Sequence, residues 1–389
     1  MYGYAPMQIP SGVIAHHFNR PSRQILVCML LLCLLNFAIP FALRAADWHA
    51  RTAVLYCLMI PLGMAQALMN PSLHKLIASW APVNERTRVH NTIYAGQNAG
   101  KMVATASSAL IASSLGWAAV FWVNSAICGC FGVAWMCAVS DTPARDPRIS
   151  AAERDHIRLT IHADSRTTAE EEHPSFFELP WRSILTSAPF FAILVNHFAY
   201  DWGTSTIDSW LPTYLKQELD FDLKHSGLIS TIPQIAGFVV VMLSGPLALA
   251  ALERRWISVT TLRKLAQGMG LLAPAALLAL LCVLHDVSRF GAVALLTAAT
   301  AFGALTYSGH HINHIDLSPT FAPILYGSTN TLANVAKIVS PLVNGGILGT
   351  GDDPGEGAWH RVFLLSAAVQ AVAGLVWLLL ASGRRQKWG

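Results

Sequence analysis

Charged side chains inside long apolar stretches are the first candidates for chemistry in this sequence. Five such residues stand out: Lys101, Asp201, Asp208, Asp316 and Lys337. A charge deep in an apolar segment is costly and is usually retained for function. Lys101 and Lys337 lie near the middle of their stretches, where each ammonium group could hold the carboxylate or phosphate of an anionic substrate. The alternatives for each lysine are a structural salt bridge and a lysine that burial neutralises.

Asp201 and Asp208 are the candidates for coupling to an ion. They are seven residues apart, which is two helical turns, so they share one face of a helix. A carboxyl group in a low-dielectric cavity takes up a proton more readily than one in water. Coupling to a proton requires this property, so we expect these two residues to bind and release the coupled proton. The alternative is a structural hydrogen bond, or pairing with Lys101 or Lys337.

Histidines raise the question of a metal. His310 and His314 are spaced i, i+4, which permits a zinc site on a helix. No matching pair occurs elsewhere in the sequence, so we expect no metal and no cofactor, and favour a hydrogen-bonded gating network there. The sequence has no phosphate-cradling glycine loop, nucleophile elbow or zinc-protease motif. We therefore do not expect an enzyme.

The elements that position these residues are membrane-spanning helices. The chain has 389 residues, of which 53% are hydrophobic and only 12% are charged, whereas a soluble domain has about 25% charged residues. Apolar stretches near the ~20 residues that cross a bilayer must be helical, because lipid offers the backbone no hydrogen bonds. The predicted spans are roughly Tyr2–Phe18, Ile25–Leu43, Ala53–Trp80, His90–Ser113, Ala118–Val139, Ile184–Leu215, Gly227–Leu252, Thr261–Leu284, Phe290–Ile315, Ala322–Leu348 and Val362–Ser382. The sequence thus predicts an all-α polytopic membrane protein whose partner is the lipid bilayer.

The distribution of basic residues predicts the orientation. One set of alternate loops, together with the C-terminus, holds 17 Lys and Arg residues, and the opposite set holds 6. The richer set should be cytoplasmic, so the C-terminus should be cytosolic. The net charge of +4 reflects this bias, so we expect no nucleic-acid partner. The sequence does not distinguish the plasma membrane from a lysosomal or vesicular membrane.

A long polar stretch divides the chain into two halves. We expect an N-terminal bundle over residues 1–140, a cytoplasmic central loop over 141–183, and a C-terminal bundle with a short tail over 184–389. Five predicted spans precede the loop and six follow it, which is close to the plan of a twelve-helix major facilitator. Ser150 with Glu153 predicts a short capped helix in the loop. The alternative there is a disordered, solvated linker.

Several motifs make the resemblance more specific. They are GYAPMQIPSG (Gly3–Gly12), PSLHKLIASWAPVNERTR (Pro71–Arg88), GWAAVFWVNS (Gly116–Ser125), PWRSILTSAPFFAILVNHFAYDW (Pro180–Trp202), LPTYLKQELDF (Leu211–Phe221), INHIDLSP (Ile312–Pro319) and GSTNTLANVAKIVSP (Gly327–Pro341). In order and spacing, the chain resembles the anion:cation symporter family of major facilitators. That family includes sialin, the vesicular glutamate transporters and the sodium–phosphate cotransporters.

The resemblance implies twelve helices in two pseudo-symmetric halves, with substrate bound near the membrane midplane and carried by alternating access. It implies a small organic or inorganic anion, with H+ or Na+ as the coupling ion, and we expect a monomer. Tyr200 aligns with an arginine of the glutamate transporters, and Asn330 lies in the last motif. We expect Tyr200 and Asn330 to bind substrate together with Lys101 and Lys337, which match no basic position of the family and are expected there from their charge at membrane depth.

The same resemblance suggests residues that gate the path. Asn313, His314 and Asp316 match the family's N-H-x-D motif at the cytoplasmic end of a helix. Glu85, Arg86 and Arg88 resemble a cytoplasmic charge latch between helices, with surface solvation as the alternative.

The sequence also departs from the family pattern. Met59 and Gln66 stand where relatives have an arginine and a glutamate, and the family's first helix, which would come before Met1, is expected to be missing. The leading prediction is a secondary active anion transporter. The alternative is a non-transporting or truncated relative that acts as a scaffold or sensor.

Overall fold

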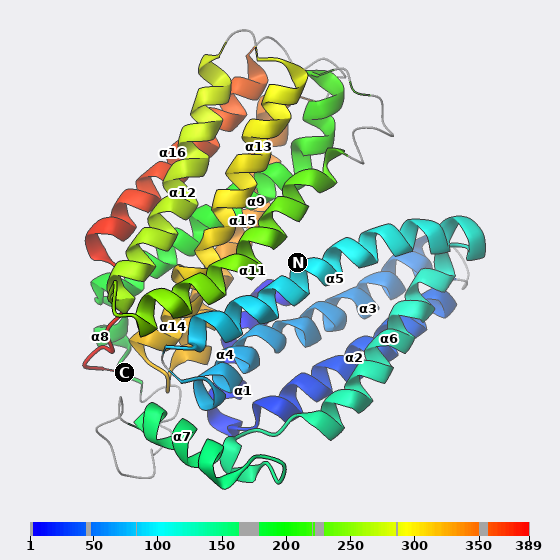
Figure 1. The fold of residues 1–389 in the computed structure, drawn as a ribbon. Helices are drawn as coiled ribbons and strands as arrows, with labels where there is room; N and C mark the ends of the chain where they lie inside the picture. The colour runs from blue at the N-terminus through cyan, green and yellow to red at the C-terminus, as the bar shows by residue number, and fades with distance from the viewer. Residues whose placement is uncertain are drawn as a thin grey trace.

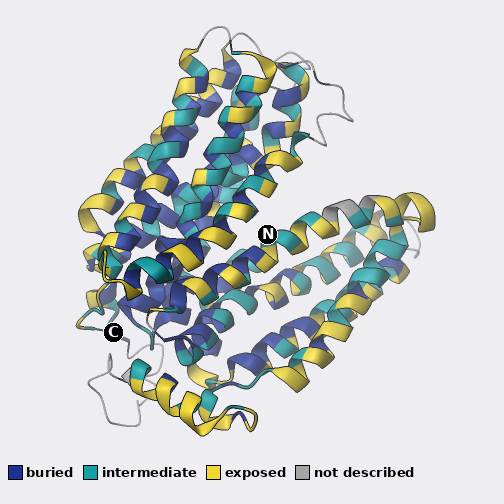
Figure 2. Cartoon of the chain, viewed as in Figure 1, coloured by how far each residue is buried: buried dark blue, intermediate teal, exposed yellow. Residues whose placement is uncertain are grey.

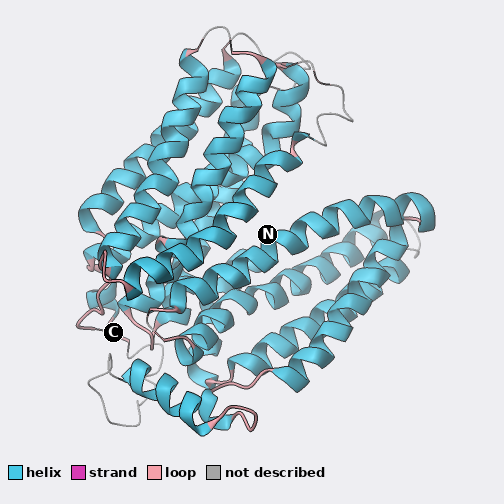
Figure 3. Ribbon diagram, in the orientation of Figure 1, coloured by secondary structure: helices cyan, strands magenta, loops and turns pink. Residues whose placement is uncertain are grey.

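Helices joined by turns and short loops make up the protein (Figure 3). The structure is a computed structural model that describes residues 3–43, 48–82, 84–162, 179–219, 221, 229–284, 287–349 and 357–388. Within these residues no strand occurs. The helices form two groups that meet at one end of the molecule and diverge at the other (Figure 1).

The first group holds the helices of the N-terminal part of the chain. They are α1 (Tyr4–Phe18), α2 (Pro21–Ala42), α3 (Trp48–Ala67), α4 (Met69–Trp80), α5 (Arg86–Leu115) and α6 (Trp117–Ala138). The second group holds α8 (Trp181–Leu185), α9 (Ala188–Gln217), α11 (Thr231–Glu253), α12 (Val259–Val283), α13 (Arg289–Gly303), the 3-10 helix η3 (Ala304–Ser308), α14 (His310–Leu317), α15 (Ala322–Leu348) and α16 (Ala358–Leu380). Every predicted span coincides with one or more of these helices.

Eight segments of the described chain are helical, long and apolar enough to cross a membrane. Three predicted spans fall outside that set: α1 has only 15 residues, and α5 and α9 are 30-residue helices with polar and charged side chains in their middles. Lys101 on α5 and Asp201 and Asp208 on α9 are among those side chains. The two long helices outside the set, α5 and α9, thus carry three of the charges expected to be functional.

Apolar side chains cover the outside of the protein and polar side chains lie inside it, as a bilayer requires. Large apolar side chains cover the outer faces of both groups, such as Leu34, Leu247 and Leu379, at 65%, 68% and 78% exposed. Asparagine, glutamine and histidine side chains lie instead among the buried residues, which are densest where the two groups meet (Figure 2). The prediction of an all-α membrane protein is confirmed.

The central loop contains the predicted short helix, α7 (Ala151–His162). The Glu153 amide donates to the Ser150 hydroxyl at 3.2 Å, as a capping serine should accept. Just before it, Arg148 donates to the Cys137 and Ala138 carbonyls at the end of α6, which satisfies carbonyls that a helix leaves free. Residues 163–178 of the loop, which include the acidic run Glu170–Glu172, lie outside the described residues.

Glycines allow the two groups to touch backbone to backbone. A Cβ at Gly12 of α1 would lie 2.6 Å from the Pro323 carbonyl oxygen, and one at Gly327 of α15 would lie 2.5 Å from that of Gln8. On the other side of the interface, a Cβ at Gly245 of α11 would lie 3.1 Å from the Arg88 Cα atom. Small residues at helix contacts are typical of membrane bundles. They bring α1 to α15 and α5 to α11 at the end where the groups meet.

Candidate functional site

A cavity of about 420 Å³ lies between the two groups of helices. Its lining comes from both groups, with Tyr4, Asn70 and Tyr94 from the first and Thr300 and Gln370 among those from the second. The residues expected to bind substrate or couple an ion all line it: Lys101, Tyr200, Asp201, Asp208, Asn330 and Lys337. A second cavity of about 380 Å³ shares Tyr4, Asn70, Gln97 and Lys337 with it.

Inside this cavity, Lys337 of α15 faces Asp201 of α9. The Nζ atom of the lysine lies 2.9 Å from the Asp201 Oδ2 atom. The two side chains form an ion pair across the contact between α15 and α9. The aspartate side chain is 4% exposed and the lysine 34% exposed, so the lysine remains reachable from the cavity.

A second ion pair joins the two groups of helices. The Lys101 Nζ atom on α5 lies 3.0 Å from the Asp208 Oδ2 atom on α9, with side chains 60% and 40% exposed. The Gln234 amide on α11 donates to the other carboxylate oxygen at 2.7 Å. Each lysine is therefore paired with one of the two aspartates. Such pairing was the alternative to anion binding for the lysines and to proton coupling for the aspartates.

Aromatic and amide side chains complete the wall of the cavity. The Asn330 Nδ2 atom donates to the Tyr4 hydroxyl at 3.4 Å, across the contact between α15 and α1. The Tyr200 ring lies 5.7 Å and 5.5 Å from the His310 and His311 rings, measured between centroids. These groups offer hydrogen-bond donors and flat faces beside the charges, a combination suited to a polar solute.

At the end where the groups meet, Arg263 bridges them. This arginine of α12 is 0% exposed, and its Nε atom donates to the Asp316 Oδ2 atom at 2.6 Å. It also donates to the Thr87 hydroxyl on α5 and the Ser308 carbonyl, both at 2.9 Å. The guanidinium of Arg263, near the start of the predicted span Thr261–Leu284, lies inside the protein, where Asp316 supplies the matching charge.

The N-H-x-D motif joins the same network. The Asn313 Nδ2 atom donates to the Asp316 Oδ2 atom at 3.1 Å and to the Ser382 carbonyl at 3.0 Å. The His314 ring contacts the His311 carbonyl at 3.1 Å and the Thr329 hydroxyl at 2.8 Å. These three motif residues are buried and lie away from the cavity lining.

The expected charge latch lies at the start of α5, next to Thr87. Arg86 is 1% exposed, Glu85 is half-buried and Arg88 is exposed. Surface solvation therefore describes Arg88 but not Arg86. Arg86 is buried next to Thr87, which accepts a hydrogen bond from Arg263. Arg86 therefore lies at the end where the two groups of helices meet.

A cluster of buried histidines was missed by the sequence analysis. His74 and His90 come from α4 and α5, and their rings lie 5.7 Å apart. His197 comes from α9 and lies 4.9 Å and 5.2 Å from the rings of His310 and His311. The sequence signal was a pair of polar residues inside each of two apolar stretches, Asn196-His197 and His310-His311. Their spacing in the sequence did not show that the two pairs lie together.

The arrangement of two helical groups around a central polar cavity matches known proteins. A family profile described as the Major Facilitator Superfamily matches residues 1–308. The chain belongs to the major facilitator superfamily. A Drosophila ananassae protein provisionally named an inorganic phosphate cotransporter is 31% identical over 100% of this chain and 78% of its own length. Sialin of Ovis aries is 31% identical over 100% of this chain and 74% of its own.

A solved structure shows the same fold. The proton:xylose symporter XylE superposes with a TM-score of 0.71 at 11% sequence identity, covering 98% of this chain and 86% of the symporter. The anion:cation symporter family predicted from the motifs is confirmed by the relatives. This major facilitator is thus related to transporters rather than to enzymes.

Proposed function

We propose that this major facilitator is a secondary active transporter of a small organic or inorganic anion, with H+ or Na+ as the coupling ion. One observation supports the proposal above the others: two lysines and two aspartates form ion pairs inside a cavity that both helical groups line. An anion entering this cavity would find two ammonium groups, each held by a carboxylate that it can displace.

The Lys337–Asp201 pair suggests how coupling would work. While Asp201 is ionised, it holds the Lys337 charge. A proton bound to Asp201 would remove that attraction and free the ammonium group for the anion. Proton and anion would then bind together, which is what symport requires. A Na+ ion could occupy the carboxylate in the same way.

Alternating access would use the two ends of the interface. In this arrangement the Arg263–Asp316–Thr87 contacts hold the groups together at one end. Breaking them and closing the Lys101–Asp208 end would expose the cavity to the other side. Residues 1–140 and 184–389 would move as the two units, with 141–183 as their connection. Asn313, His314 and Asp316, with Glu85, Arg86 and Arg88, would form the gate at the closed end.

Uptake into proteoliposomes tests this function. Inorganic phosphate, glutamate and sialic acid are offered in turn, under an imposed pH gradient or a Na+ gradient. We expect one of these anions to accumulate under one gradient. Lys337→Met should reduce uptake by at least tenfold and Lys101→Met by less, because Lys101 is more exposed. Lys387→Met, an exposed lysine in the tail, serves as the control and should leave uptake unchanged.

Asp201→Asn separates coupling from binding. This variant imitates the protonated carboxyl group, so it should keep anion exchange without a gradient and lose acceleration by a pH gradient. Full gradient-driven uptake by Asp201→Asn would exclude this residue as the coupling site. Absence of uptake of every offered anion by correctly folded protein would favour the scaffold or sensor alternative.

A further inference from the structure

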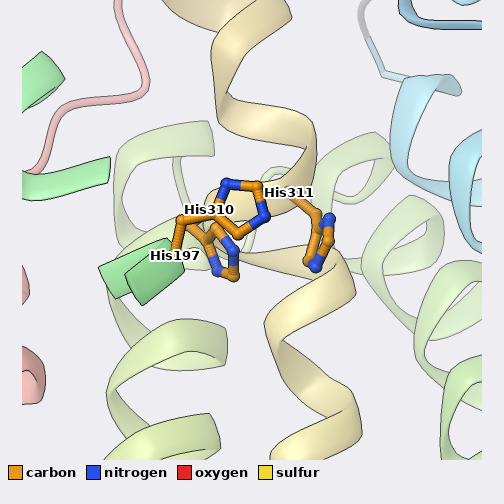
Figure 4. Close-up of side chains that lie close together, drawn as sticks. All are labelled: His197, His310 and His311. Atoms are coloured by element: carbon orange, nitrogen blue, oxygen red, sulfur yellow. The ribbon is translucent and has the colours of Figure 1, made fainter. Parts of the chain in front are cut away.

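Three histidines converge at the inner wall of the cavity. His197 comes from α9, and His310 and His311 come from the start of α14, so that their imidazole rings lie next to one another (Figure 4). One ring nitrogen from each lies within 4.8 Å of the other two. All three side chains are buried, at 1%, 0% and 6% exposed. Three convergent imidazoles are a ligand set for a transition metal.

Hydrogen bonds hold two of these rings with a nitrogen free. The His310 Nδ1 atom donates to the Gln267 Oε1 atom at 2.9 Å, so its Nε2 atom keeps an unshared electron pair. The His314 Nδ1 atom donates to the His311 carbonyl, so its Nε2 atom accepts the single Thr329 hydroxyl proton at 2.8 Å. The Thr329 oxygen therefore accepts from the His197 Nδ1 atom at 3.1 Å. Metal-binding histidines have the same arrangement, with one ring nitrogen on an acceptor and the other on the ion.

The nitrogens left over have nothing to bind within the protein. The His310 Nε2 atom and both ring nitrogens of His311 are buried without a hydrogen-bond partner. A buried polar atom with no partner destabilises the folded state and calls for an explanation. His314, which the sequence paired with His310, does not share this feature, because both of its ring nitrogens are engaged.

We propose that His197, His310 and His311 bind a divalent transition-metal ion of the Zn²⁺ class. Zinc–nitrogen bonds of about 2.0–2.1 Å place tetrahedral ligand atoms about 3.4 Å apart, closer than the 4.8 Å within which these nitrogens lie, so the rings would have to turn toward the ion. His197 and His311 also line the cavity, so the site would lie at its wall. The site does not rest on the transport proposal, and it revises the expectation that the protein holds no metal.

Spectroscopic titration tests the site. The purified full chain, with any affinity tag removed, is stripped with a chelator and titrated with Co²⁺. We expect one Co²⁺ per chain, with the visible absorption bands of a tetrahedral nitrogen site, and displacement by Zn²⁺. A folded wild-type protein that binds no Co²⁺ with such bands would overturn the proposal.

Variants assign the ligands. His197→Gln and His310→Gln should each weaken Co²⁺ binding by more than 100-fold. Gln267→Met keeps all three histidines but removes the acceptor for His310, and should weaken binding about 10–100-fold. His90→Gln, a buried neighbour, and His156→Gln, exposed on α7, are controls and should bind within threefold of wild type. If Gln267→Met, His197→Gln and His310→Gln all bound Co²⁺ as tightly as wild type, these histidines would not form the site. The same conclusion would follow if the two control variants lost as much affinity as the ligand variants.

Discussion

Lys337 on α15 lies 2.9 Å from Asp201 on α9, inside a cavity that both helical groups line. The aspartate is almost fully buried, while the lysine is one-third exposed to the cavity. Loss of the partner should therefore destabilise the aspartate charge more than the lysine charge. Removal of the lysine leaves a buried carboxylate, whereas removal of the aspartate leaves an ammonium group that water can still reach.

This asymmetry predicts the result of a double-mutant cycle. Lys337→Met should lower the free energy of unfolding by about 1–3 kcal/mol, less than the 3–5 kcal/mol of a fully buried pair, because the lysine is partly exposed. Asp201→Asn should cost less, and the double variant should cost less than the sum of both. Thermal or denaturant unfolding in detergent measures the cycle. The exposed Lys101–Asp208 pair is the comparison and should couple by about 1 kcal/mol or less. Additive losses at Lys337 and Asp201 would contradict the pairing.

The Arg263–Asp316 pair should matter more for stability. Both side chains are at most 3% exposed, so Arg263→Met leaves Asp316 as an uncompensated buried charge. We expect a loss of about 3–5 kcal/mol, measured by unfolding in detergent. Arg255→Met is the control: this arginine is exposed, and its replacement should change stability by about 0.5 kcal/mol or less. Similar effects of the two substitutions would argue against a buried pair.

Two glycines of α15 provide a matched test of the interface. Gly327→Ala places a Cβ 2.5 Å from the Gln8 carbonyl oxygen, whereas Gly346→Ala meets no atom within 4 Å. Overpacking should cost the first variant about 1–3 kcal/mol, while the second should be neutral or gain up to about 1 kcal/mol in helix propensity. Unfolding in detergent compares the two. The prediction fails if Gly327→Ala is as stable as Gly346→Ala.

Asp146 in the loop after α6 predicts a pH effect. Hydrogen bonds from Arg148 hold the pKa of this carboxyl group below its ordinary value. Its ionised form is therefore favoured by folding, so the pair stabilises the protein above the ordinary pKa of about 3.9 and loses that effect as the pH falls toward the lowered value. Asp146→Asn should melt below wild type at pH 7 and at pH 5 alike. The difference in melting temperature should shrink only below about pH 4, and a constant difference down to pH 3 would refute the assignment.

Orientation can be tested by labelling. Because basic residues concentrate in one set of loops, we expect α7 and the C-terminal tail to face the cytosol. Single cysteines at His156 and Ser382, in a background without the seven native cysteines, should react with an impermeant reagent only after cells are permeabilised. A cysteine introduced at Phe290, at the opposite end, is the complementary probe if the protein reaches the cell surface. Labelling of His156→Cys in intact cells would reverse the orientation.

Local sequence determined the helices and the residues of the cavity. Lys101, Asp201 and Lys337 were identifiable because a charge in an apolar helix must face protein or water rather than lipid. Ser150 and Glu153 predicted α7 because helix capping depends on residues only three apart. Motif order predicted the family. Each of these inferences uses chemistry that is written within one segment of chain.

Tertiary structure decided which of these groups meet. The residues around Arg263 do not distinguish it from an arginine in a loop, because it lies among basic residues at the start of an apolar stretch. Its burial is stable only because Asp316 and Thr87 lie within hydrogen-bonding distance of its guanidinium group. His197 joins His310 and His311 in the same way, because α9 and α14 pack together. Pairing energies depend on distance in space, and no local pattern contains the distance between segments that lie far apart in the chain.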